Sequence, residues 1–458
     1  MRCLYNIAIW FYALAVRVVA LFDHKVRLMW QGEREAYAKI EAGLADGDRV
    51  VWVHAASLGE FEQGRPLIEK IRREDPEYKI LLTFFSPSGY EIRKNYGGAD
   101  VIAYLPLDTA RNARRFVELV KPEKVVFVKY EFWLNYLREL RVRGVDTYII
   151  SAIFRPGQVF FKWYGGLFRE GLKAFKMLFV QNEESKKLLK GIGVENVVVA
   201  GDTRFDRVAD VVAAAKKLDV VEIFINAQCT MHNAQSLDNA QCTMHNAQLS
   251  MSQLPVLVVG SSWGPDEELL ARYINERAGR MKMIIAPHEV GEERIRELTS
   301  KLTCKWVLYT NAQCTMHNAQ LGEARDSSQI TDYRLQITDK TLNTYDCLVV
   351  NTIGLLSSVY QYGQVAYIGG GFGVGIHNTL EAAAWGMPVV FGPNYKKFKE
   401  ACELIECGAG CSIKNYEECA QSLDYFFKNN NEASTSSKEY VAKNTGATKL
   451  IYNNIFSN

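Results

Sequence analysis

Two glutamates are the first residues whose type and setting could support chemistry. Glu60 ends the segment His54–Glu60 (HAASLGE), directly after an apolar run, and Glu131 lies in Lys129–Trp133 (KYEFW) after another. Carboxylates at strand ends can act as general bases in a pocket. However, Ser57 and Glu60 also have the spacing of a helix capping box, and Glu131 could pair with a nearby lysine or arginine. The residues alone leave both interpretations open.

A glycine-rich segment further along the chain is suited to an anion. Gly369–Glu381 (GGGFGVGIHNTLE) stands between an apolar run ending at Ile368 and a helical run beginning at Leu380. Such a loop brings backbone amides and a helix N-terminus to a phosphate. Its glycines lack the G-x-G-x-x-G spacing and no Walker lysine follows, which argues against NAD and ATP. Asn378 and Glu381 again have capping-box-like spacing, so helix capping is the alternative for Glu381.

Two other predicted strand ends in the same half carry possible oxyanion donors. Ser261 and Ser262 follow one apolar run, and His288 follows the next. A single histidine is more often structural than functional. Together with the glycine-rich segment, three candidate donors gather at the strand ends of one domain, which favours an anion site there.

The elements that must position these residues alternate between short β-branched runs and helical stretches. Their continuous apolarity indicates parallel strands covered by helices on both faces, as in a doubly wound α/β domain. The first series comprises Arg49–His54, Lys79–Phe84, Val101–Tyr104, Lys124–Val128, Asp146–Ile150, Met177–Gln181 and Asn196–Ala200. The second comprises Pro255–Gly260, Met281–Ala286, Trp306–Tyr309, Cys347–Val350, Val365–Ile368 and Pro388–Phe391. Two Rossmann-like domains are therefore predicted, each with ligands at the carboxyl ends of its strands.

Composition agrees with this interpretation and excludes some partners. The 458 residues exceed what one core usually supports, and the net charge of +2 gives no field that would attract nucleic acid. No Cys-x-x-Cys pair occurs among the ten cysteines, so we expect reduced thiols. The sequence Asp46-Gly47-Asp48 fits a turn, and no metal or other cofactor is predicted.

Identical polar repeats interrupt the second series. The decapeptide NAQCTMHNAQ occurs at Asn226–Gln235, Asn239–Gln248 and Asn311–Gln320. Solenoid units diverge and are apolar, whereas these copies are identical and polar, so we interpret them as insertions near 226–250 and 311–342. A zinc site is the alternative, and its ligands would be Cys229, His232, Cys242 and His245.

The N-terminal run Leu4–Phe22 is almost wholly apolar and aromatic and is just long enough to cross a bilayer. Arg17 is its only charge, and Lys25 and Arg27 follow where anionic lipid would hold them. Residues 1–25 are therefore predicted to be a membrane anchor, which either spans the membrane or lies on its surface. A helix packed on the protein is the alternative.

Taken together, the motifs resemble those of the 3-deoxy-D-manno-octulosonic acid (Kdo) transferases of lipopolysaccharide biosynthesis. The resemblance extends from the N-terminus to about Ile413. The matching segments are Ala56–Glu60, Glu131–Trp133, Gly260–Ser262, Pro287-His288 and His377–Glu381. It implies a GT-B fold, CMP-Kdo as donor, a lipid A precursor (lipid IVA) as acceptor, and a location on the cytoplasmic side of the cell inner membrane.

The resemblance also assigns roles by position. Residues 26–205 would form the acceptor domain and 206–458 the donor domain. Glu60 would be the general base and Glu131 a second essential carboxylate. The donor-binding residues would be Ser261, Ser262, His288, Gly371, Gly373, Asn378 and Glu381. Alternative functions are a GT-B enzyme that uses a UDP-sugar, or a sugar-nucleotide binding protein without turnover.

Overall fold

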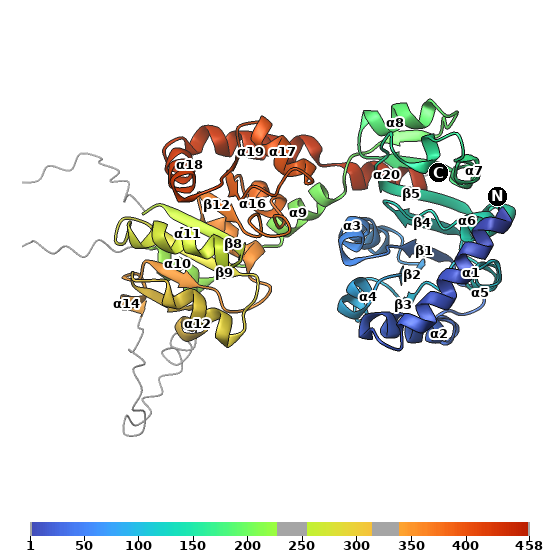
Figure 1. Cartoon of the computed structure of the whole chain (residues 1–458), viewed down its shortest axis with the longest axis horizontal. Coiled ribbons are helices and arrows are strands. Elements are labelled where there is room, and N and C mark those ends of the chain that lie inside the picture. Colours follow the sequence, from blue (N-terminus) through green and yellow to red (C-terminus); the bar gives the residue numbers. More distant parts are fainter. Residues whose placement is uncertain (1, 227–253, 314–338, 457–458) are drawn as a thin grey trace, which may run out of the picture. The chain divides into compact units, whose positions relative to one another are not determined.

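The structure is a computed structural model that describes residues 2–226, 254–313 and 339–456 (Figure 1). The chain forms two compact units. Unit 1 comprises Met1–Arg207 and Asn444–Asn458, and unit 2 comprises Val208–Lys443. Most of the repeated decapeptides, and with them the four residues of the alternative zinc site, lie outside the described residues.

Unit 1 contains a parallel sheet of seven strands in the order β3-β2-β1-β4-β5-β6-β7. The strands are β1 (Val50–His54), β2 (Lys79–Phe84), β3 (Val101–Tyr104), β4 (Lys124–Val128), β5 (Asp146–Ala152), β6 (Met177–Val180) and β7 (Val197–Val199). Each agrees with its predicted range to within two residues. The doubly wound α/β prediction is confirmed for this unit.

Helices cover both faces of this sheet, as the alternation of side chains along β1 shows. Trp52 packs into one apolar core, whereas Val51 and Val53 pack into the other. The helices are α1 (Arg2–Val19), α2 (His24–Gly43), α3 (Leu58–Glu74), α4 (Pro87–Arg93), α5 (Ala110–Val120), α6 (Leu134–Val142), η1 (Val159–Phe161), α7 (Gly166–Leu172), α8 (Glu183–Lys190), α9 (Arg204–Ala213) and α20 (Ala447–Phe456). Helix α9 continues into unit 2.

Unit 2 contains a second parallel sheet of seven strands, in the order β10-β11-β9-β8-β12-β13-β14. Its strands are β8 (Val256–Ser262), β9 (Lys282–Pro287), β10 (Trp306–Leu308), β11 (Cys347–Val349), β12 (Val365–Ile368), β13 (Val389–Phe391) and β14 (Gly410–Ser412). The sequence did not predict β14, because its three residues are short or polar and only half-buried.

The described helices of unit 2 surround this sheet (Figure 1). They are α10 (Asp219–Ile225), α11 (Gly264–Asn275), α12 (Glu292–Ser300), α14 (Asp339–Leu342), α15 (Leu356–Val359), η2 (Tyr360–Tyr362), α16 (Leu380–Ala384), α17 (Lys399–Glu406), α18 (Tyr416–Lys428) and α19 (Asn430–Asn444). The prediction of two Rossmann-like domains is therefore confirmed.

The N-terminal helix α1 is shorter than the predicted run Leu4–Phe22. It ends at Val19 because the side chain of Arg27 donates to the carbonyls of Ala20 and Leu21, which closes a turn. By length and composition α1 could cross a membrane. Val16 is its one buried residue, so most of its apolar surface is exposed.

The C-terminal helix α20 belongs to unit 1. The predicted second domain is 206–458, with a helical tail after Ser436 that could pack across either domain. Ile451 and Ile455 are buried in a core of unit 1. The carboxylate of Asp206 accepts hydrogen bonds from the amides of Gly446 and Thr448, which fixes the start of the helix. The end of the chain therefore completes the first domain.

Candidate active site

The predicted site residues of each unit gather where its strand order reverses. In unit 1 the chain leaves β1 toward β2 on one side and returns to β4 on the other. In unit 2 the corresponding pair is β8 and β12. Open α/β sheets bind ligands at the carboxyl ends of strands at such switch points. The topology therefore places a candidate site in each unit.

Glu60 lies in the first turn of α3, close to the end of β1. Its Oε2 accepts a hydrogen bond from the Ala56 amide at 2.7 Å. The Ser57 side chain makes no capping bond, so the predicted capping box is incomplete. A Cβ built on Gly59 would meet no atom within 4 Å, which leaves space beside the carboxylate. Only the glutamate half of the capping box is present, since Glu60 also bonds the backbone of Ser57.

Glu131 follows β4 and is 9% exposed. Its Oε2 accepts a hydrogen bond from Nε1 of Trp133 at 2.5 Å and lies 3.2 Å from Nε2 of His54. Lys129, between β4 and Glu131, has a φ of 68°, a conformation that costs energy for a non-glycine residue and is common at functional sites. The turn after β4 therefore directs Glu131 back toward the end of β1.

His54 connects Glu131 to the core through fully buried side chains. Nε1 of Trp52 donates to Oγ1 of Thr83 at 2.7 Å, and this oxygen lies 2.9 Å from Nδ1 of His54. Since Thr83 receives the indole hydrogen, its own hydroxyl hydrogen is available for Nδ1 of His54. If Thr83 donates to Nδ1, a neutral His54 ring carries its proton on Nε2, which faces Glu131.

The two carboxylates occupy different electrostatic settings. Burial, followed by the charge of Glu131, raises the pKa of Glu60 from 4.5 to about 7, against the opposing effect of the Ala56 amide and Lys129. Glu131 instead has two donor side chains. Neighbouring carboxyl groups with such different surroundings are typical of acid–base sites. A base with a pKa near 7 is well matched to neutral pH.

A cavity of about 740 Å³ opens at Glu131, and we refer to it as the aromatic cavity. Arg155 contributes an exposed guanidinium to its wall. The lining residues are Tyr5, Ala56, Phe85, Tyr130, Glu131, Phe132, Trp133, Arg155, Gln158, Val159, Phe160 and Phe168. Aromatic and apolar walls around one carboxylate suit a ligand with both apolar and hydroxyl groups.

In unit 2, the two serines at the end of β8 differ in their availability. Ser261 is half-buried and has a φ of 53°, again a strained conformation at a strand end. Ser262 is buried and donates its hydroxyl hydrogen to Glu267, which pairs with Arg294. Ser261 is therefore the serine that remains available to a ligand.

His288 lies in a stack of three rings at the carboxyl ends of the strands. Its ring stacks on Trp263 at 4.7 Å and on His377 at 4.4 Å between centroids. Nε1 of Trp263 donates to Nε2 of His377 at 3.1 Å, so Nε2 of His377 is an acceptor. Burial, followed by His288, lowers the pKa of His377 and favours its neutral form. His288 itself remains exposed.

The glycine-rich segment forms a tight loop that is tied to the start of α11. The Gly370 amide donates to Asp266, which also accepts from the Trp263 amide. Gly371 packs against the backbone of Gly392, and a Cβ there would lie 2.6 Å from the Gly392 Cα. The Gly373 amide donates to the Gly370 carbonyl within a turn. Of the two predicted donor-binding glycines, Gly371 is thus constrained by packing, and Gly373 has its N–H already bonded.

Asn378 and Glu381 contact each other directly. Nδ2 of Asn378 donates to Glu381 at 3.0 Å, and Oγ of Ser357 donates to the other carboxylate oxygen at 2.5 Å. The residue preceding α16 is Thr379, and the side chain of Asn378 accepts from the Leu380 amide. The predicted capping box is therefore absent, and Asn378 and Glu381 instead form a hydrogen-bonded pair where the glycine-rich loop enters α16.

No group of three or more metal-ligating side chains is found in 2–226, 254–313 and 339–456. The seven cysteines of these ranges are free thiols. Asp46 pairs with Lys121, and Asp48 accepts from the Ala45 amide, as expected for a turn. The groups available for a ligand are therefore hydrogen-bond donors, carboxylates and cationic side chains.

Four residues of these two sites were not predicted as site residues from the sequence: His54, Trp133, Trp263 and His377. His54, Trp133 and His377 lie inside segments already singled out, and Trp263 directly follows Ser262. What identifies them is the pairing of strands, which brings His54 to Glu131 and Trp263 to His377. A signal was present in the sequence, namely polar aromatic residues at the ends of strands.

Comparison with known proteins identifies relatives of similar sequence. Residues 30–207 match the family model of 3-deoxy-D-manno-octulosonic-acid transferase (kdotransferase). The chain is similar to the 3-deoxy-D-manno-octulosonic acid transferase of Aquifex aeolicus, with 25% identity over 87% of this chain and 92% of the relative. The chain is also similar to the 3-deoxy-D-manno-octulosonic acid transferase of Chlamydophila psittaci, with 25% identity over 80% of this chain and 74% of the relative.

A solved structure supports the fold. The UDP-GlcNAc 2-epimerase of Neisseria meningitidis bound to UDP-GlcNAc aligns with a TM-score of 0.56 and 14% identity, covering 90% of this chain and all of that one. At this identity the likeness concerns the fold alone. The two-domain GT-B architecture is therefore supported independently of the motifs.

Proposed function

We propose that this chain, which belongs to the Kdo transferase family, transfers Kdo from CMP-Kdo to a lipid A precursor at the cytoplasmic face of the inner membrane. The chain is a glycosyltransferase, and the proposal concerns its donor, its acceptor and its location. The observation that carries it is the carboxylate pair of Glu60 and Glu131 at the switch point of unit 1, with the pKa of Glu60 raised to about 7.

In the proposed reaction Glu60 removes the proton of an acceptor hydroxyl. The oxygen forms a bond to the anomeric carbon of Kdo while the bond to the CMP phosphate breaks, and CMP leaves with the electron pair. Glu131, held by His54 and Trp133, orients the acceptor and keeps Glu60 basic through its negative charge. With one base and no second group acting as nucleophile, direct displacement inverts the anomeric configuration.

Unit 2 would bind the donor. Ser261, His288 and the backbone of the loop around Gly371 provide positive character for the departing phosphate. The polar pair of Asn378 and Glu381 would hold the cytidine ribose or phosphate at the same edge. Gly373 and Ser262 would shape this loop and strand end, because their own donors are already bonded.

Helix α1 supports the membrane part of the proposal. Leu4, Trp10, Phe11 and Leu14 are among its exposed apolar residues. Tyr5 donates to Asp108 at 2.6 Å, and Asn6 accepts from Asn135 at 3.0 Å, so α1 is fastened to unit 1 near its first residues. A helix held in this way favours attachment to the membrane surface over spanning.

The test is to incubate the purified chain with CMP-Kdo and a lipid A precursor and to measure the product mass. We expect the mass of the lipid acceptor to increase by that of one or more Kdo residues. We expect CMP, rather than UDP, to inhibit the formation of this product. Turnover with a UDP-sugar would support the alternative GT-B enzyme. Binding of CMP-Kdo without any product would support a sugar-nucleotide binding protein.

A further inference from the structure

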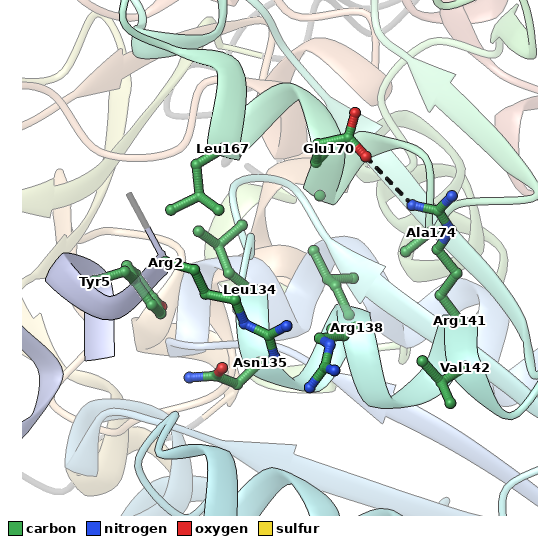
Figure 2. Close-up of a pocket in the computed structure, with 12 residues that line it drawn as sticks. Arg2, Tyr5, Leu134, Asn135, Arg138, Arg141, Val142, Leu167, Glu170 and Ala174 are labelled. Carbon is green, nitrogen blue, oxygen red and sulfur yellow. Dashed lines mark ion pairs between the residues drawn. The ribbon is translucent and has the colours of Figure 1, made fainter. Parts of the chain in front are cut away.

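A second cavity in unit 1 combines cationic and apolar walls. It has a volume of about 530 Å³ and lies between α1, α6 and α7 (Figure 2). We refer to it as the arginine pocket. Its lining residues are Arg2, Tyr5, Leu134, Asn135, Leu137, Arg138, Arg141, Val142, Leu167, Glu170, Gly171 and Ala174. Neither Glu60 nor Glu131 lines it, so it is separate from the aromatic cavity, although Tyr5 borders both.

The positive charge of the arginine pocket is not fully neutralised. Arg141 lies 3.5 Å from Glu170, but Glu170 also accepts a hydrogen bond from Lys173 at 2.5 Å. Burial, followed by the charge of Arg138, lowers the pKa of Arg2 against the attraction of Glu139, and Arg2 makes no ion pair within the described part of the chain. Figure 2 shows the guanidinium groups of Arg2 and Arg138 converging on one part of the pocket. An anion placed there would relieve this repulsion.

Arg138 adds to this excess because its own partner is shared. Its Nη1 lies 3.6 Å from Glu139, whose other carboxylate oxygen pairs more closely with Arg143. Glu139 is not among the residues that line the pocket. The lining of the cavity thus includes three arginines and one glutamate, and Figure 2 shows that Arg141 is the arginine that reaches toward Glu170.

The remaining walls and the surroundings are apolar. Leu134 and Leu137 are buried beneath the cavity, and Val142 at its edge is 70% exposed. Trp163, three residues before α7, is 91% exposed, and α1 also has exposed apolar side chains. Exposed aromatic residues and basic residues are both enriched at the boundary between lipid headgroups and acyl chains.

We propose that the arginine pocket binds an anionic phospholipid of the bilayer, with the phosphate at the guanidinium groups of Arg2 and Arg138 and the first part of an acyl chain on Leu134 and Leu167. The two walls match the two halves of such a lipid, a phosphate ester and a hydrocarbon chain. This inference concerns binding and does not depend on which sugar the chain transfers. The bound lipid would hold the start of α1 at the membrane surface.

The experiment uses the full chain and its binding to phosphatidylcholine vesicles with and without phosphatidylglycerol. The variant Arg138→Gln/Arg141→Gln removes two charges from the pocket, and Arg111→Gln/Arg114→Gln removes two from the exposed surface of α5 as a matched control. We expect the pocket variant to bind phosphatidylglycerol vesicles roughly thirtyfold more weakly, at about 1 kcal/mol for each basic residue. The control variant should bind at close to the wild-type level.

A second pair of variants tests the pocket without removing an arginine. Val142→Glu places a negative charge at its edge, and Val142→Gln has nearly the same shape without the charge. We expect Val142→Glu alone to weaken binding to phosphatidylglycerol vesicles. Since Val142 is exposed, neither change should alter the unfolding transition.

Three results would overturn the proposal. Equal weakening by the pocket and control variants would indicate general attraction to a charged surface. Displacement of the vesicles by an equal concentration of inorganic phosphate would assign the pocket to a free anion. Normal vesicle binding by the pocket variant, with a raised KM for the lipid acceptor in detergent free of phospholipid, would assign it to the acceptor.

Discussion

Replacement of Glu60 by glutamine separates catalysis from structure. Glutamine keeps the length of the side chain and an oxygen that can accept from the Ala56 amide, which Glu60 binds at 2.7 Å. It cannot accept a proton at neutral pH. Because Ser57 makes no capping bond, little helix stability depends on a reciprocal capping box here. The variant therefore changes the charge of one group and preserves its main contact.

The pKa of Glu60 gives the sign and size of the effect on stability. A carboxyl group whose pKa is raised by folding destabilises the native state as pH rises through that pKa, because ionisation is easier in the unfolded chain. The displacement from 4.5 to about 7 corresponds to about 3 kcal/mol at most. Wild type and Glu60→Gln should thus have similar stability near pH 4.5. The variant should become the more stable of the two, by up to that amount, above pH 7.

The effect on rate has the opposite direction. Loss of a general base costs roughly a hundredfold to ten-thousandfold in turnover. We expect Glu60→Gln to bind CMP normally and to lose at least a hundredfold in kcat. The wild-type kcat should rise with pH through about 7, since the base must be ionised. Near-normal turnover, or a stability difference that does not change with pH, would refute the reasoning and leave Glu131 as the candidate base.

Three further predictions concern other contacts. His54→Phe removes the 3.2 Å contact with Glu131. It should lower kcat roughly tenfold or more with little change in CMP affinity, and unchanged kinetics would contradict the positioning role. Gly371→Ala places a Cβ against Gly392 and should weaken CMP binding in a titration, whereas Gly373→Ala, with its nearest atom at 3.5 Å, should bind normally. Ile451→Ala should destabilise unit 1 by about 2–5 kcal/mol in urea without altering CMP affinity, because its fully buried side chain belongs to a core of that unit.

The strands could be predicted from the sequence because burial on both faces requires continuous β-branched residues. Strand β14 (Gly410–Ser412) is the exception, since a half-buried strand at the edge of a sheet needs no such pattern. The end of α1 at Val19 also escaped prediction. It depends on Arg27, which donates to carbonyls six and seven residues earlier, and hydropathy carries no information about that contact.

The candidate site shows why residue types are easier to predict than their partners. Glu60 and Glu131 are separated by 70 positions in the chain, and they interact because β1 and β4 are neighbours in the sheet. That neighbour relation follows from the reversal of strand order, which local sequence does not encode. The turn after β4 adds a second requirement, since Lys129 adopts a positive φ that its residue type disfavours.

Backbone strain at Lys129 is therefore informative about function. Ser261, at the end of β8 in unit 2, has a similar φ of 53°. Such conformations persist only when the surrounding structure fixes them, and a glycine would adopt either one without strain. In each unit a strained residue stands at the switch point, next to groups proposed to bind a substrate. The strained backbone and the perturbed carboxylate thus identify the same edge of the sheet in unit 1 by independent physical criteria.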